Sequence, residues 1–223
     1  MIIISFLIKE SPLRETARKS ITTLPKNFPL SDKEVIIWIS IAVIFCCNCM
    51  AVPIVHLIPL LTDKGFSPQF ASNVFMVLMF FGIFGRIFSG KLGDTIGALP
   101  TYLLMSAGQT ISVFWFPYFQ SSLSLYILAA VFGFTYSGVM SAILVCARMM
   151  VSPNFAGRAM SFGSFFGWVG MGTGGFIGGY FYDLKGDYNW SYQFASIMGI
   201  TNVIILLFLW LRVKNRINKE KII

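Results

Sequence analysis

The chain has 223 residues, of which 56% are hydrophobic and 12% are charged, and its formal net charge is +8. A soluble domain carries about 25% charged residues, so this composition and the repeated apolar runs exclude an ordinary soluble protein and indicate a polytopic membrane protein. The basic residues stand in the gaps between the apolar runs, which favours a lipid bilayer as partner and no nucleic acid.

The first 34 residues precede the long apolar runs. Residues 1–8 are apolar but too short to cross a membrane, and they lack the basic start of a signal peptide. We interpret them as the tail of a preceding helix that is missing from this chain. Residues 9–34 are basic and contain three prolines, so we expect a cytosolic linker there. The domain organisation is completed by a transmembrane bundle over residues 35–212 and a basic cytosolic tail over residues 213–223.

Six apolar stretches predict an all-α fold, a bundle of six transmembrane helices. The gaps between them are short, so neighbouring helices are expected to be antiparallel. The third begins near Pro100, where the missing N–H costs little at a helix start. The expected spans are residues 35–61, 69–89, 99–119, 122–146, 159–182 and 190–211.

The lysines and arginines divide unevenly between the two ends of these spans. One side receives only Lys64 and Lys185, and Arg86 lies within a span. Positively charged residues collect on the cytosolic side, which predicts cytosolic termini and an integral protein of the plasma (inner) membrane. The other 14 of the 17 basic residues fall on that side: Lys9, Arg14, Arg18, Lys19, Lys26, Lys33, Lys91, Arg148, Arg158, Arg212, Lys214, Arg216, Lys219 and Lys221.

Residues 85–97 close the second span and open the third. The stretch from 91 to 97 is polar and glycine-rich, so we expect a tight turn outside the lipid. Asp94 can bond backbone amides there or lie near a helix N-terminus.

The composition offers no site for catalysis or for a metal. The four cysteines lie inside apolar runs without metal-ligand spacing, and we interpret them as small packing residues. One histidine and no carboxylate within a span leave no nucleophile with a base at membrane depth. We therefore expect no catalytic residue, no metal, no cofactor and no enzymatic activity.

The fifth span is unusually rich in glycine, mostly at intervals of four residues. Small residues at this spacing let another helix approach closely. The pattern predicts tight packing, and it also suits a helix that slides or lines a passage. The residues expected to form this packing stripe are Gly163, Gly167, Gly170, Gly174 and Gly178.

Several stretches resemble the major facilitator superfamily. The sequence from Gly90 through Asp94 to Gly97 resembles its loop motif, and other stretches are similar to the monocarboxylate porter and oxalate/formate antiporter branch. The similarity covers roughly residues 35–212. The stretches that carry the branch similarity are residues 56–65, Arg86 four residues before Gly90, residues 132–134, residues 141–144 and residues 178–188.

This resemblance implies the C-terminal six-helix half of a twelve-helix transporter that works by alternating access. The expected partners are a small organic anion, the bilayer, and either a missing N-terminal half or a second copy of the chain. The expected function is secondary active transport of a monocarboxylate by this chain or by a longer protein of which it is a fragment. The alternative is a non-transporting membrane sensor or assembly partner that kept the fold.

Arg86 is the main candidate for substrate binding, because an arginine within a span is costly and its guanidinium can hold a carboxylate with two hydrogen bonds. The resemblance gives an arginine at this place the role of carboxylate anchor. Alternatively, Arg86 lies about 26 Å along the helix from Gln69 and can reach the cytosolic interface. Many relatives carry an aspartate where this chain has Gly82, and the antiporters carry a lysine that residues 159–182 lack. The first difference argues against proton coupling through an aspartate–arginine pair. The missing lysine favours a single carboxylate or another anion.

Three further polar residues are candidates for the same site. His56 can titrate near neutral pH, but it can equally bond Asn48, a carbonyl or water. Asn48 and Tyr136 can line a cavity or bond a neighbouring helix.

A gating role is expected for residues at the cytosolic end. Asp94 is expected to bond the start of the fifth span, near residues 155–159, in the outward-open state only. Gly90, Gly97 and Arg158 complete this set of gating residues.

Overall fold

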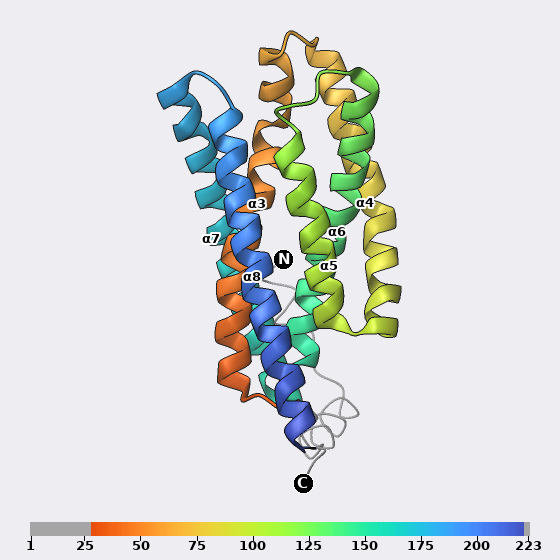
Figure 1. Ribbon diagram of the computed structural model, residues 1–223, viewed down its shortest axis with the longest axis vertical. Helices are drawn as coiled ribbons and strands as arrows, with labels where there is room; N and C mark the ends of the chain where they lie inside the picture. Colours follow the sequence, from red (N-terminus) through yellow and green to blue (C-terminus); the bar gives the residue numbers. More distant parts are fainter. Residues whose placement is uncertain (1–27, 221–223) are drawn as a thin grey trace, which may run out of the picture.

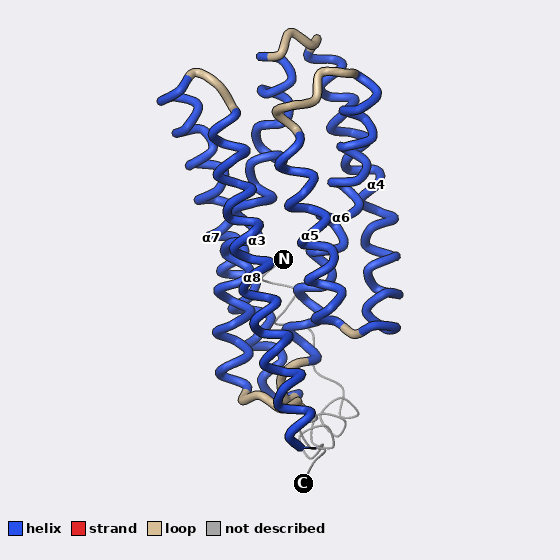
Figure 2. The backbone as a smooth tube through the Cα atoms, viewed as in Figure 1, coloured by secondary structure: helices blue, strands red, loops and turns tan. Residues whose placement is uncertain are grey.

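The computed structural model describes residues 28–220, and its regular structure is entirely helical (Figures 1 and 2). The interpretations of residues 1–8 and most of 9–34 fall outside this range. Each of the six predicted spans corresponds to one helix. The helices are α3 (Asp32–Asp63), α4 (Pro68–Ile96), α5 (Ala98–Trp115), α6 (Ser122–Met149), α7 (Pro153–Lys185) and α8 (Asn189–Glu220).

The helix ends follow from local chemistry. The Ser67 hydroxyl accepts a hydrogen bond from the backbone N–H of Phe70 at 3.2 Å, and Pro68 occupies the first turn of α4. At the other end of α4, Gly97 has φ +95° and alone separates α4 from α5. Gly186 takes the left-handed conformation that ends α7. The connections are therefore short, and successive helices run in opposite directions (Figure 1).

Two closely packed helix pairs organise the bundle. The most extensive contacts join α4 to α6 and α3 to α7, while α5 and α8 pack on each other and on these pairs. The most apolar stretch of α3 is 67% buried, against 28% for that of α4, so α3 is central and α4 peripheral. The ends of α4, α6 and α8 and the start of α3 lie at the lower end of Figure 1.

Four helices in the described part of the chain are long and apolar enough to cross a membrane. They are α3, α4, α6 and α8. The prediction of six helices is confirmed, but α5 and α7 do not reach the same apolar density. Polar residues such as Gln109 interrupt α5, and glycines lower the hydropathy of α7.

The core is filled mainly by side chains from α3, α5, α6 and α8. Tyr102, Phe116, Phe132 and Tyr192 are among the largest fully buried side chains. All four cysteines are free thiols and buried, as expected for packing residues. No group of potential metal ligands occurs in the range 28–220.

Three helix ends differ from the ends of the predicted spans. Residues 91–96 continue α4 as helix, where a turn was expected. A helix end that lies in water needs no apolar composition. In this last turn the Thr95 hydroxyl donates a hydrogen bond to the Leu92 carbonyl at 2.9 Å. Likewise α8 continues to Glu220 through most of the expected tail. Conversely, α5 ends at Trp115, four residues before the expected end.

Candidate functional site

Arg86 lies on α4, and its side chain is exposed on the surface of the bundle. Residues of α4 that pack against neighbouring helices include Gly82, Gly85 and Ser89. At about 100° per residue, Arg86 flanks this packed face on the side opposite the exposed phenylalanines. That phenylalanine stripe comprises Phe80, Phe81, Phe84 and Phe88.

Tyr136 of α6 is the candidate residue that interacts electrostatically with Arg86. The Tyr136 ring stacks on Phe132, with 5.8 Å between the ring centroids, which fixes its direction. No ion pair within the described residues involves Arg86. Its guanidinium donors can therefore serve an anion, with a hydroxyl donor nearby.

Tyr136 also lines a cavity of about 240 Å³ between α3, α6 and α7. The walls are mostly apolar, and Cys47, Tyr136 and Ser164 supply polar atoms. A mostly apolar pocket with a few polar groups is typical of a small-molecule site. The lining residues are Val43, Cys47, Met50, Tyr136, Met140, Ile143, Leu144, Gly163, Ser164, Gly167, Trp168 and Met171.

His56 and Asn48 lie elsewhere, in the interface between α3 and α7. The His56 Nε2 is 2.9 Å from the Gly175 carbonyl oxygen, and the imidazole packs against the Tyr188 ring at 5.4 Å. Asn48 donates to the Ile44 carbonyl of its own helix and accepts from the Thr173 hydroxyl of α7. Both side chains are buried, and neither lines the cavity that contains Tyr136.

The glycines of α7 have two kinds of surroundings. A Cβ built on Gly170 or Gly174 would come within 2.8 Å of α3 atoms, and one on Gly178 would lie 2.9 Å from the His56 ring. Gly163 and Gly167 instead line the cavity that contains Tyr136, and their lack of a side chain leaves this cavity open. One stripe of glycine thus serves close packing at one end of α7 and an opening at the other.

The expected gating residues lie at the basic end of the bundle but in two separate places, between α4, α5 and α6 and between α3 and α7. Gly90 and Asp94 line a cavity of about 160 Å³ between α4, α5 and α6. Gly97 forms the turn at its edge, with φ +95°. The Arg158 guanidinium carbon lies 5.4 Å from the centre of the Phe155 ring, in the first turns of α7.

Asp32 is a functional candidate that the sequence did not reveal. Its carboxylate accepts from the backbone N–H of Ser152 at 2.9 Å and from the Ser152 hydroxyl, which ties the start of α3 to the start of α7. The two residues are 120 positions apart, so no local pattern could pair them. The contact occupies the α7 start where Asp94 was expected to bind.

Comparison with known proteins identifies the class. The model of the Major Facilitator Superfamily matches residues 37–222. Because this match covers most of the chain, the protein belongs to that superfamily of membrane transporters, whose members are typically not enzymes.

Among particular proteins, the chain is similar to Monocarboxylate transporter 13 of Rattus norvegicus. The two sequences are 31% identical over 166 residues, which are 71% of this chain and 37% of the rat protein. The chain thus spans well under two thirds of that relative's length.

Proposed function

We propose that this chain is the C-terminal half of a secondary transporter that moves a small monocarboxylate by alternating access. The observation that carries the proposal is Arg86, a cation exposed on a membrane helix, without an ion pair in the described residues and in electrostatic interaction with the Tyr136 phenol. A guanidinium binds a carboxylate through two parallel hydrogen bonds. The name of the rat relative points to the same class of substrate.

A single carboxylate fits better than a dicarboxylate. Gly82, one turn before Arg86, faces the Ser137 side chain of α6 so closely that a Cβ there would collide with it. A carboxylate at this position would have to displace the Ser137 hydroxyl, and the 159–182 stretch contains no lysine as a second anchor. We infer one cationic anchor in this half and no carboxylate–arginine pair for proton coupling through α4.

The second wall of the substrate path would come from another bundle. The faces of α4 and α7 expose large aromatic side chains, including Phe84 and Trp168, which is 77% exposed. Such surfaces suit lipid or a partner bundle. The relative's greater length favours an N-terminal six-helix half as the partner over a second copy of this chain.

Orientation and gating complete the proposal. The basic end of the bundle would face the cytosol of the plasma (inner) membrane. Rocking against the partner would alternate the sides on which Arg86 is accessible. Asp94, with Gly90, Gly97 and Arg158, would gate this end. In the change of state, the Asp94 carboxylate would replace the Asp32 carboxylate as the hydrogen-bond acceptor at the start of α7.

Uptake of a labelled monocarboxylate tests the proposal. The chain is co-expressed with a matching N-terminal half, and Arg86→Ala and Arg86→Lys are compared with Lys91→Ala, which removes an exposed cation from the same helix. We expect both Arg86 variants to lose most uptake, because lysine lacks the paired donors, while Lys91→Ala keeps it. Undiminished uptake in both Arg86 variants would remove Arg86 from the mechanism. Binding without flux in sealed vesicles would instead favour a sensor.

A further inference from the structure

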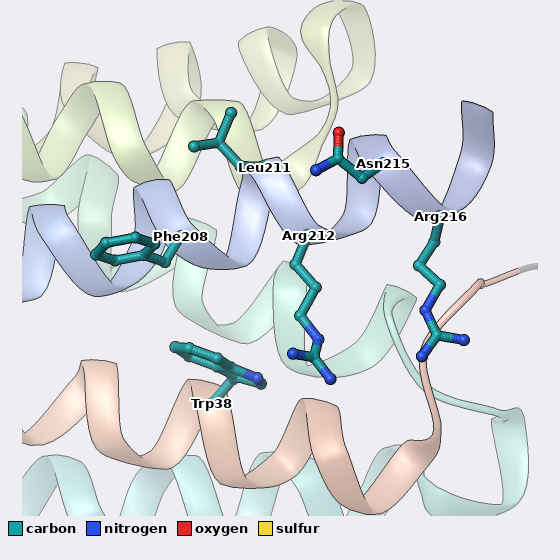
Figure 3. A pocket seen from close by; sticks show the side chains of 6 residues that line it. All are labelled: Trp38, Phe208, Leu211, Arg212, Asn215 and Arg216. Atoms are coloured by element: carbon teal, nitrogen blue, oxygen red, sulfur yellow. The ribbon is translucent and has the colours of Figure 1, made fainter. Parts of the chain in front are cut away.

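A further cavity lies between the start of α3 and the end of α8, and it shares no lining residue with the cavity that contains Tyr136. Its volume is about 580 Å³. Figure 3 shows Trp38 beside Phe208, and the Arg212 and Arg216 side chains reaching from α8 toward α3. Leu211 and Asn215 complete the lining.

The polar part of this cavity has the chemistry of a phosphate site. Arg212 and Arg216 are four residues apart, so their side chains share one face of α8. The Arg212 Nε lies 2.7 Å from the Glu34 carboxylate of α3, which holds this guanidinium in place. Arg216 makes no ion pair with any described residue. Guanidinium groups bind phosphate oxygens through paired, charge-assisted hydrogen bonds.

The apolar part lies on the side toward the middle of the bundle. Phe208 is 60% exposed and Leu211 is 42% exposed, and both precede the arginines along α8. Arg212 stands about 35 Å along the helix from Asn189, beyond the roughly 30 Å of a hydrocarbon core. Trp38, one turn and a half into α3, lies at the same boundary, where tryptophan is favoured. The lining therefore changes from apolar to cationic along the direction of a membrane lipid.

We propose that this cavity binds an anionic phospholipid from the leaflet at the basic end of the bundle. Arg216 and Arg212 bind the headgroup phosphate, and Phe208 and Leu211 contact the upper acyl chains. The exposed apolar side chains favour a lipid over a soluble phosphate, which gains nothing from them. The proposal requires that the bundle lies in a membrane and does not depend on the substrate or on Arg86.

Native mass spectrometry of the purified full chain in detergent tests this proposal. The probes are phosphatidylglycerol, phosphatidylcholine with the same acyl chains, and inorganic phosphate. The variants are Arg216→Gln, which leaves the Glu34–Arg212 pair intact, and the double variant Arg212→Gln/Arg216→Gln. Lys214→Gln is the matched control, because it removes one cation from the same turns of α8 while its ammonium lies over the Trp210 ring, 5.3 Å from the centroid, and outside the cavity lining.

We expect phosphatidylglycerol to bind more tightly than phosphatidylcholine. Arg216→Gln should weaken phosphatidylglycerol binding about fivefold, the usual effect of one basic residue near a charged leaflet, and the double variant should weaken it further, while Lys214→Gln should not. Equal losses in Arg216→Gln and Lys214→Gln would overturn the site, since they indicate net charge alone. Equal binding of the two lipids, or arginine-dependent binding of inorganic phosphate without lipid binding, would overturn it as well.

Discussion

Gly174 is the position at which packing of α7 on α3 can be tested with one methyl group. A Cβ built there lies 2.7 Å from the Asn48 carbonyl oxygen, 2.8 Å from the Asn48 Cα and 2.8 Å from the Ala51 Cβ. Ordinary contact begins at 3.4 Å, so the backbone of α3 would have to retreat by about 0.7 Å. Backbone atoms cannot swing aside, and overpacking of this kind costs about 1–3 kcal/mol.

We therefore expect Gly174→Ala to lower the melting temperature of the detergent-purified chain by several degrees, on the order of 2–4 °C per kcal/mol for a chain of this size. Gly172→Ala on the same helix is the control, because a Cβ there meets nothing within 4 Å. The control should be unchanged or slightly more stable, since alanine favours helix over glycine by about 1 kcal/mol. An equally stable Gly174→Ala, or an equal loss in both variants, would refute the packing argument.

Three further predictions concern polar contacts of the bundle. Burial lowers the pKa of Lys64, which follows α3, from 10.5 to about 8. Between about pH 8 and pH 10.5 the unfolded chain therefore binds more protons than the folded chain, so the stability of the fold rises with pH. Lys64→Gln should flatten this rise, which is measured as the melting temperature against pH. Asp32→Ala should speed hydrogen exchange at the start of α7, because the Ser152 N–H and hydroxyl lose their acceptor. Asn202→Leu should lower the unfolding free energy by about 1–3 kcal/mol, because the Ser106 hydroxyl loses its 2.9 Å bond to the Asn202 amide; a chemical denaturation series measures this, and an unchanged midpoint would contradict it.

The number and order of the helices could be predicted from the sequence because each apolar run has the length that a bilayer requires. The ends were less accurate where composition misled. The composition of residues 91–96 predicted a turn, yet these residues are helical, and α4 ends only at Gly97, whose φ is +95°. Hydropathy reports preference for lipid, whereas a helix ends where its capping geometry changes.

The contacts of the candidate residues could not be predicted in the same way. Sequence spacing does not fix the rotation of one helix against another. The sequence therefore could not show that Tyr136, of the three further candidates, is the one that interacts electrostatically with Arg86. His56 and Gly175 are 119 positions apart. The sequence left His56 either in the substrate site or bonded to Asn48, a carbonyl or water, and in the structure its imidazole bonds the Gly175 carbonyl. The glycine spacing of α7 predicted close approach, but not that it applies at Gly170 and Gly174 while Gly163 has open space.

The most direct test of the central proposal is whether position 86 is reached from water. Arg86→Cys, paired with a matching N-terminal half, is treated with a charged thiol reagent in sealed vesicles, and Phe84→Cys on the opposite flank of α4 is the control. The native cysteines are buried. We predict that Arg86→Cys is labelled and that Phe84→Cys stays unreactive. Absence of labelling at position 86, or equal labelling at positions 86 and 84, would contradict the proposal.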